Sequence, residues 1–99
     1  MSRSLVERRL AEVSSRLRKL RGELHVADEQ LLHLAEQADE ARLRALVSET
    51  PVAERDHRDA ARHAEAMQRF RAELEQSIVE LERTQDELLD RLSALLGST

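Results

Sequence analysis

Apolar residues recur at alternating spacings of three and four through most of this 99-residue chain. We call the positions of this frame the seam. In the first half, where every seam position is apolar, they are Val6, Leu10, Val13, Leu17, Leu20, Leu24, Ala27, Leu31, Leu34, Ala38, Ala41 and Ala45. In the second half they are Ala53, His57, Ala60, Ala64, Met67, Arg71, Leu74, Ile78, Leu81, Gln85, Leu88, Leu92 and Leu95. Because this spacing puts one apolar stripe on one side of a helix, it predicts long α-helices that pair as a coiled coil.

The segment 46–56, LVSETPVAERD, interrupts the helical pattern. A proline inside a helix costs about 3 kcal/mol, but it is well accepted at the first helical position, and Thr50 before Pro51 is a suitable N-cap. We therefore predict a helix over 4–47, a turn over 48–50 and a second helix over 51–96, folded as a single antiparallel all-α hairpin. A continuous helix kinked at Pro51 is the structural alternative.

Both chain ends carry signals for helix termini. Ser4 and Glu7 have the spacing of a capping box, in which a hydroxyl and a carboxylate each accept a hydrogen bond from a free backbone N–H. Gly97 suits the left-handed residue that often closes a helix. These signals place the helix ends close to the ends of the chain.

A turn centred on Glu49 sets the register of the predicted hairpin. The expected seam pairs are Leu10 with Leu88, Leu17 with Leu81, Leu24 with Leu74, and Leu31 with Met67. A shifted register with a longer loop also packs acceptably. In the second half, three seam positions are polar, namely His57, Arg71 and Gln85.

A polar residue in a seam needs a partner and can fix the register of the two helices. For Arg71 the expected register brings Asp28 and Glu23 within reach. The alternative is that Arg71 extends its aliphatic stem along the seam and its charge into water.

The composition excludes some classes of function and disfavours others, among them nucleic-acid binding. Aromatic residues make up 1% of the chain, there is no cysteine, and the net charge of −4 comes from acidic and basic residues that are interspersed. This distribution gives no basic stripe for nucleic acid, and no apolar run is long enough for a membrane. No activated nucleophile, glycine-rich phosphate loop or carboxylate pair in a cleft is evident, so we expect a cytoplasmic protein without catalysis or cofactor.

The exposed helix faces contain many acidic and basic residues four apart. Five pairs have the favourable order and predict ion pairs on solvated faces: Glu12 and Arg16, Glu40 and Arg44, Glu54 and Arg58, Glu65 and Arg69, and Glu87 and Arg91.

A second group of apolar residues lies off the seam, and we call it the outer apolar set. Its members are Leu5, Val26, Leu32, Leu43, Leu46, Val47, Phe70, Val79, Leu89 and Leu96. A two-helix hairpin cannot bury them, and a homodimer forming a four-helix bundle is the simplest cover. The sequence thus predicts an interaction or scaffold protein that binds itself or another helical protein.

Acidic residues cluster around the predicted turn, and we take Glu49, Glu54, Asp56 and Asp59 as candidates for a functional tip. Asp56, Asp59 and Ala61 in DHRDAA match the D-x-x-D-x-A pattern, and over these six residues the chain resembles the hairpin tip of DksA-type factors. The resemblance implies a transcription modulator that inserts a coiled coil into RNA polymerase, with Asp56 and Asp59 as tip acids. The zinc-finger cysteines of that family are missing.

A third hypothesis is a metal-binding helical bundle. Glu54 and His57 form an E-x-x-H unit, which places a carboxylate and an imidazole on one helix face. A dimer would supply this unit twice, with Glu36 or Glu40 as further ligands.

Overall fold

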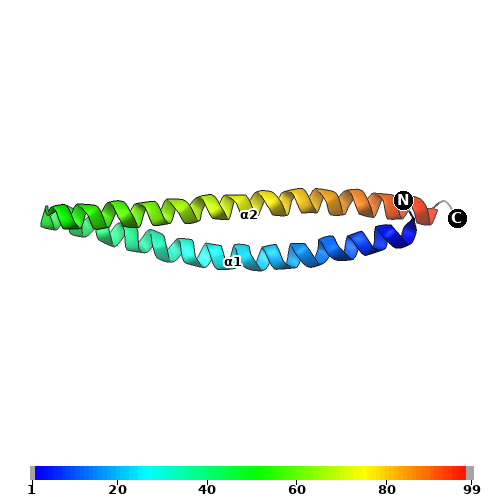
Figure 1. The fold of residues 1–99 in the computed structure, drawn as a ribbon, viewed down its shortest axis with the longest axis horizontal. Helices are drawn as coiled ribbons and strands as arrows, with labels where there is room; N and C mark the ends of the chain where they lie inside the picture. The colour runs from blue at the N-terminus through cyan, green and yellow to red at the C-terminus, as the bar shows by residue number, and fades with distance from the viewer. Residues whose placement is uncertain (1, 98–99) are drawn as a thin grey trace. The chain divides into compact units, whose positions relative to one another are not determined.

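The computed structural model describes residues 2–97, which form two long helices joined by a short turn (Figure 1). Helix α1 spans Arg3–Ser48 and helix α2 spans Pro51–Gly97. No residue between 2 and 97 belongs to a strand, and the two helices pack as a hairpin, so the predicted all-α hairpin is confirmed. Each helix boundary lies within one residue of the prediction, and only Glu49 and Thr50 remain in the turn. Between residues 2 and 97, neither helix contains a segment that is both long and apolar enough to cross a membrane.

The contacts divide the predicted single hairpin into two compact units, each built from both helices. Unit 1 contains residues 1–23 and 74–99, and unit 2 contains residues 24–73, including the turn. In a pair of long helices, each residue contacts only residues at a similar position along the helix axis. No single hydrophobic core therefore joins the two ends of the pair.

Unit 1 has a core of large aliphatic side chains. Its buried residues are Val6, Leu17, Leu74, Ile78 and Leu88. Half-buried Gln85 donates a hydrogen bond from Nε2 to Ser14 Oγ at 3.2 Å, and exposed Arg21 and Glu82 form an ion pair at 3.2 Å. The Ser14–Gln85 contact lies within one position of the expected register.

Unit 2 has a different core, because its fully buried side chains are both alanines, Ala27 and Ala41. Leu31 and Met67, which the expected register pairs, are half-buried. Small buried side chains let two helices approach closely, but they remove little apolar surface from water. Unit 2 therefore gains less from burial than its apolar content would allow.

Side-chain burial follows the seam throughout residues 2–97. Every seam residue is buried or half-buried. Off the seam, the residues that are not exposed are Ser14, Asp59, Ala61 and Thr84. The spacing of apolar residues therefore identified the inner face of both helices.

The turn ends α1 and starts α2 within two residues. Glu49 has a φ of 53°, in the left-handed region, and its N–H bonds the carbonyl of Ala45 at 3.1 Å. A left-handed residue that bonds back in this way closes a helix. Thr50 then caps α2, because its Oγ1 accepts a hydrogen bond from the N–H of Ala53 at 3.2 Å.

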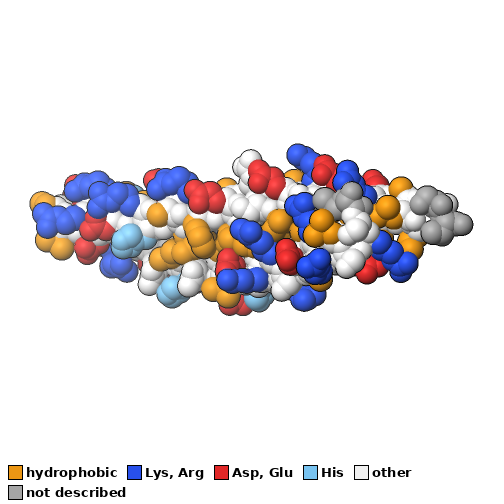
Figure 2. All heavy atoms as spheres, turned by 45° about the vertical axis from the view of Figure 1, so that its right-hand side comes forward, with side chains coloured by type: hydrophobic (Ala, Val, Ile, Leu, Met, Phe, Trp, Pro, Cys, Tyr) orange, Lys and Arg blue, Asp and Glu red, His pale blue; other side chains and the backbone are white. Residues whose placement is uncertain are grey.

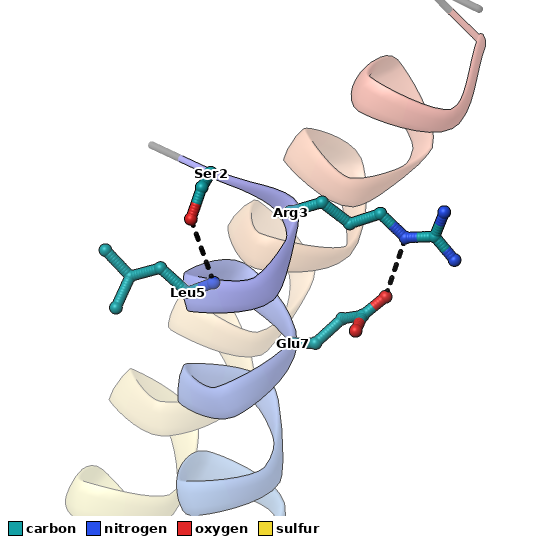
Figure 3. Close-up of polar contacts among 4 residues, drawn as sticks. All are labelled: Ser2, Arg3, Leu5 and Glu7. Carbon is teal, nitrogen blue, oxygen red and sulfur yellow. Dashed lines mark hydrogen bonds and ion pairs between the residues drawn. The ribbon is translucent and has the colours of Figure 1, made fainter.

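The start of α1 differs from the prediction (Figure 3). Ser2, not Ser4, is the N-cap, since its Oγ accepts a hydrogen bond from the N–H of Leu5 at 3.2 Å. Glu7 pairs with Arg3 at 2.8 Å instead of completing a capping box. Because the cap is Ser2 and not Ser4, the helix begins two residues earlier than a cap at Ser4 would allow.

Gly97 is the last residue of α2 and does not have a positive φ, so the predicted left-handed closure at this residue is wrong. Glycine permits a left-handed conformation but does not require one.

The exposed charges pair differently from the prediction. None of the five predicted pairs lies within ion-pair distance, whereas His25 and Glu29 form an i,i+4 contact at 3.1 Å. Exposed ion pairs contribute only about 0 to 1 kcal/mol, so side-chain freedom in water competes with them. Figure 2 shows acidic and basic side chains interspersed on the visible face, with hydrophobic side chains between them.

Candidate protein-interaction surface

The outer apolar set is exposed in the structure. Every member predicted from the sequence has a large solvent-accessible fraction, from 40% for Leu5 to 85% for Val47. The structure adds Val52, which is 66% exposed in the first turn of α2. The sequence could have identified Val52, because it is an apolar residue off the seam, directly before seam residue Ala53.

The exposed apolar residues belong to both units. Among residues 2–97, unit 1 contains four of them, namely Leu5, Val79, Leu89 and Leu96. Unit 2 contains the others, namely Val26, Leu32, Leu43, Leu46, Val47, Val52 and Phe70. The unit whose fully buried residues are alanines thus also exposes more large apolar side chains.

Three members of this set form a compact group on α1 beside the turn, and we call Leu43, Leu46 and Val47 the tip patch. Leu43 and Leu46 stand three apart, and Leu43 and Val47 stand four apart. Residues at these spacings are neighbours on a helix surface. The patch therefore presents contiguous apolar area to solvent at the turn end of unit 2.

A groove of about 310 Å³ lies next to the tip patch and involves both helices of unit 2. From α1 it is lined by Arg42, Ala45 and Leu46, and from α2 by Glu54, His57 and Arg58. Half-buried His57 thus lies beside charged groups and an exposed leucine. This combination of apolar and charged groups suits contact with a protein side chain.

The four acidic tip candidates have different surroundings. Glu49, Glu54 and Asp56 are exposed, and Glu54 lines the groove. Asp59 is half-buried, and its Oδ1 accepts a hydrogen bond from Arg62 Nη2. The carboxylate of Asp59 is therefore already engaged within the chain.

The three polar seam residues lie on the inner face and are half-buried. The Nε of Arg71 donates to Oδ1 of Asp28, one of the two partners that the register predicted. Gln85 bonds Ser14, and His57 is half-buried at the groove. Arg71 and Gln85 therefore link the two helices within their own units.

Within one chain, residues 2–97 contain no group of three or more His, Cys, Asp or Glu side chains arranged to hold a metal ion. Glu54 and His57 of the E-x-x-H unit share the groove beside the turn, together with two arginines. A cationic neighbourhood of this kind opposes cation binding.

Comparison with known proteins adds no relative: no family model, no curated protein and no solved structure matches the chain.

Proposed function

We propose that this protein is a non-catalytic coiled-coil interaction module that self-associates to cover its outer apolar set. The observation that carries the proposal is the contrast within unit 2, where alanines are the fully buried side chains while Leu43, Leu46 and Val47 are exposed. Large contiguous apolar patches on a protein surface mark sites of protein interaction. A homodimer in a four-helix arrangement supplies two further helix faces to cover them.

The test combines absolute mass from light scattering at several concentrations with binding of a hydrophobic dye. The wild-type chain is expected to form a dimer, and a variant with Leu43→Ser and Leu46→Ser is expected to dimerise at least about tenfold more weakly. Because both leucines are exposed, the variant should keep its helicity in circular dichroism. Gln30→Ser with Gln37→Ser is the matched control, since both glutamines are exposed on α1 in the same unit.

A folded wild-type monomer that binds no hydrophobic dye contradicts the proposal. A monomer that is poorly helical and binds the dye assigns the outer apolar set to a different helical protein.

The alternative function, a hairpin tip that reaches into RNA polymerase, has less support. It requires free acidic groups at the tip, whereas Asp59 is paired with Arg62. Asp56→Asn with Asp59→Asn separates the two functions, because it should alter a transcription assay only if the tip acts on polymerase.

A further inference from the structure

One side of unit 1 carries an ion pair between the two helices, and we call it the ion-pair side. Arg21 of α1 and Glu82 of α2 lie 3.2 Å apart, and their side chains are 52% and 48% exposed. Ser14 stands seven residues before Arg21, on the same helix face, and accepts a hydrogen bond from Gln85 at 3.2 Å. Exposed Ala11, three residues before Ser14, extends this side along α1.

The ion-pair side also holds three of the four large apolar residues that are exposed in the described part of unit 1. Leu89 and Leu96 follow Glu82 at intervals of seven residues, and Val79 precedes it by three. Residues at these spacings share a helix face. The exposed fractions are 48% for Leu89, 47% for Leu96 and 53% for Val79. This side of α2 therefore presents apolar area on both sides of an exposed charge.

A two-fold axis parallel to the helices makes the ion-pair side complementary to itself. Such an axis keeps every residue at its own level and sets α1 of one copy against α2 of the other, with both turns toward the same end. Because Arg21 reaches Glu82 of its own chain, it then also faces Glu82 of the second copy. The two ion pairs form a ring of four charges in which neighbours always have opposite signs.

The same arrangement covers residues of the outer apolar set in both units. In unit 1, Leu89 faces Ala11 of the second copy, whose small side chain leaves room for a leucine. In unit 2, the same register sets Leu46 of the tip patch opposite Glu54 of the second copy, and both residues line the groove beside the turn. The tip patch therefore takes part in the same dimer.

The other side of unit 1 is unsuited to this arrangement. Arg9 and Ala11 flank seam residue Leu10, so they lie on opposite sides of the unit. Arg9 lines a groove of about 230 Å³ together with Arg91 and Glu87 of α2. The same two-fold axis on that side would bring together four arginines and only two glutamates, and like charges disfavour a contact. The charges of unit 1 thus select the ion-pair side.

We propose that a second copy of this chain docks on the ion-pair side of unit 1, with α1 of each copy against α2 of the other and the Arg21–Glu82 pairs at the centre. The inference rests on the proposed self-association and assigns its surface in unit 1 and its orientation. Each charge of the ring gains a second partner of opposite sign, which offsets the loss of water around it.

The test reverses the charges of the ring. In R21E four carboxylates meet, and in E82R four guanidinium groups meet, so each variant should dimerise at least about tenfold more weakly than wild type. The double variant R21E/E82R restores the alternation and should regain the wild-type mass. An equimolar mixture of the two single variants restores only the attractions between copies, and it should form a mixed dimer. Light scattering, with one variant tagged for identification, measures mass and composition.

R16E and E87R are the matched controls, because they make the same charge changes at exposed positions of the same two helices in unit 1. Arg16 and Glu87 directly precede seam residues, as Arg9 does, so they lie away from the ion-pair side. Both controls should dimerise like wild type, and circular dichroism checks that every variant stays helical.

Engineered cysteines test the orientation separately, since the chain has no cysteine of its own. An equimolar mixture of A11C and L89C should form a disulfide between chains under mild oxidation, whereas each variant alone should form few. Disulfides that form mainly in A11C alone indicate that α1 meets α1, and they contradict the proposed docking.

The inference is overturned if R21E and E82R dimerise as tightly as wild type, or if their mixture stays monomeric. If either result occurs while the Leu43→Ser, Leu46→Ser variant dissociates and wild type does not, the proposed function stands and this contact falls. A wild-type chain that is monomeric at all concentrations overturns both.

Discussion

Glu49 ends α1 in a backbone conformation that is energetically unfavourable for every residue except glycine. Its φ of 53° lies in the left-handed region. In this conformation the Cβ atom lies too close to the following carbonyl oxygen, which costs roughly 1 to 2 kcal/mol. The hydrogen bond from its N–H to Ala45 and the cap by Thr50 hold it there. Glycine has no Cβ and meets no such crowding.

Replacing Glu49 by glycine should therefore stabilise the protein by about 0.5 to 1 kcal/mol, after the greater freedom of glycine in the unfolded chain is subtracted. Glu49→Val should destabilise it, because a β-branched side chain is least tolerated at positive φ. Chemical denaturation followed by circular dichroism measures both. A Glu49→Gly protein less stable than wild type would show that the side chain of Glu49 itself supports the turn.

The polar contacts show which side-chain partners the sequence could reveal. Arg71 lies on the seam, so the expected register was sufficient to name Asp28 and Glu23 as candidate partners, and the structure shows the contact with Asp28. Ser14, the partner of Gln85, lies off the seam and carried no comparable signal. The expected pair of Glu12 with Arg16 did not form, because weak exposed attractions do not fix two flexible side chains.

At the scale of the helices, the seam determines which face is buried, and Leu17 is its most informative test. Leu17 is 1% exposed in unit 1, so Leu17→Ala should lower the free energy of unfolding by about 2 to 4 kcal/mol through lost burial and a cavity. Arg18→Ala, at the next and exposed position, should change it by less than about 0.5 kcal/mol. Thermal and urea unfolding measure the difference. Equal effects of the two substitutions would contradict the assignment of the inner face.

The helices were predictable because the alternating three and four spacing is a collective signal from many residues. Their ends depend on one or two hydrogen bonds each, and such local choices are close in energy. Ser2 and Ser4 are both competent caps, and only the structure distinguishes them. The left-handed Glu49 carried no sequence signal, since glycine is the usual residue at such a position.

For the whole molecule, the identity of the exposed apolar residues was more predictable than the partner that covers them. The seam frame identified the apolar residues that are exposed, and within the described residues 2–97 the structure adds only Val52. Binding of a second copy depends on the free energy of association, which is set by both partners and not by the exposed residues of one chain alone. The division into two units was also beyond the sequence pattern, because the seam is continuous through the boundaries near residues 23 and 74.

Self-association would couple folding to protein concentration, which gives a prediction for the intact chain. If the folded form is a dimer, each tenfold rise in concentration should increase its free energy of unfolding by about 1.4 kcal/mol per mole of dimer. The thermal midpoint from circular dichroism should therefore rise across two decades of concentration. The Leu43→Ser, Leu46→Ser variant should unfold at a midpoint that depends less on concentration. A wild-type midpoint that stays constant means that the folded chain is stable without a second copy, and the outer apolar set is then left for another protein to cover.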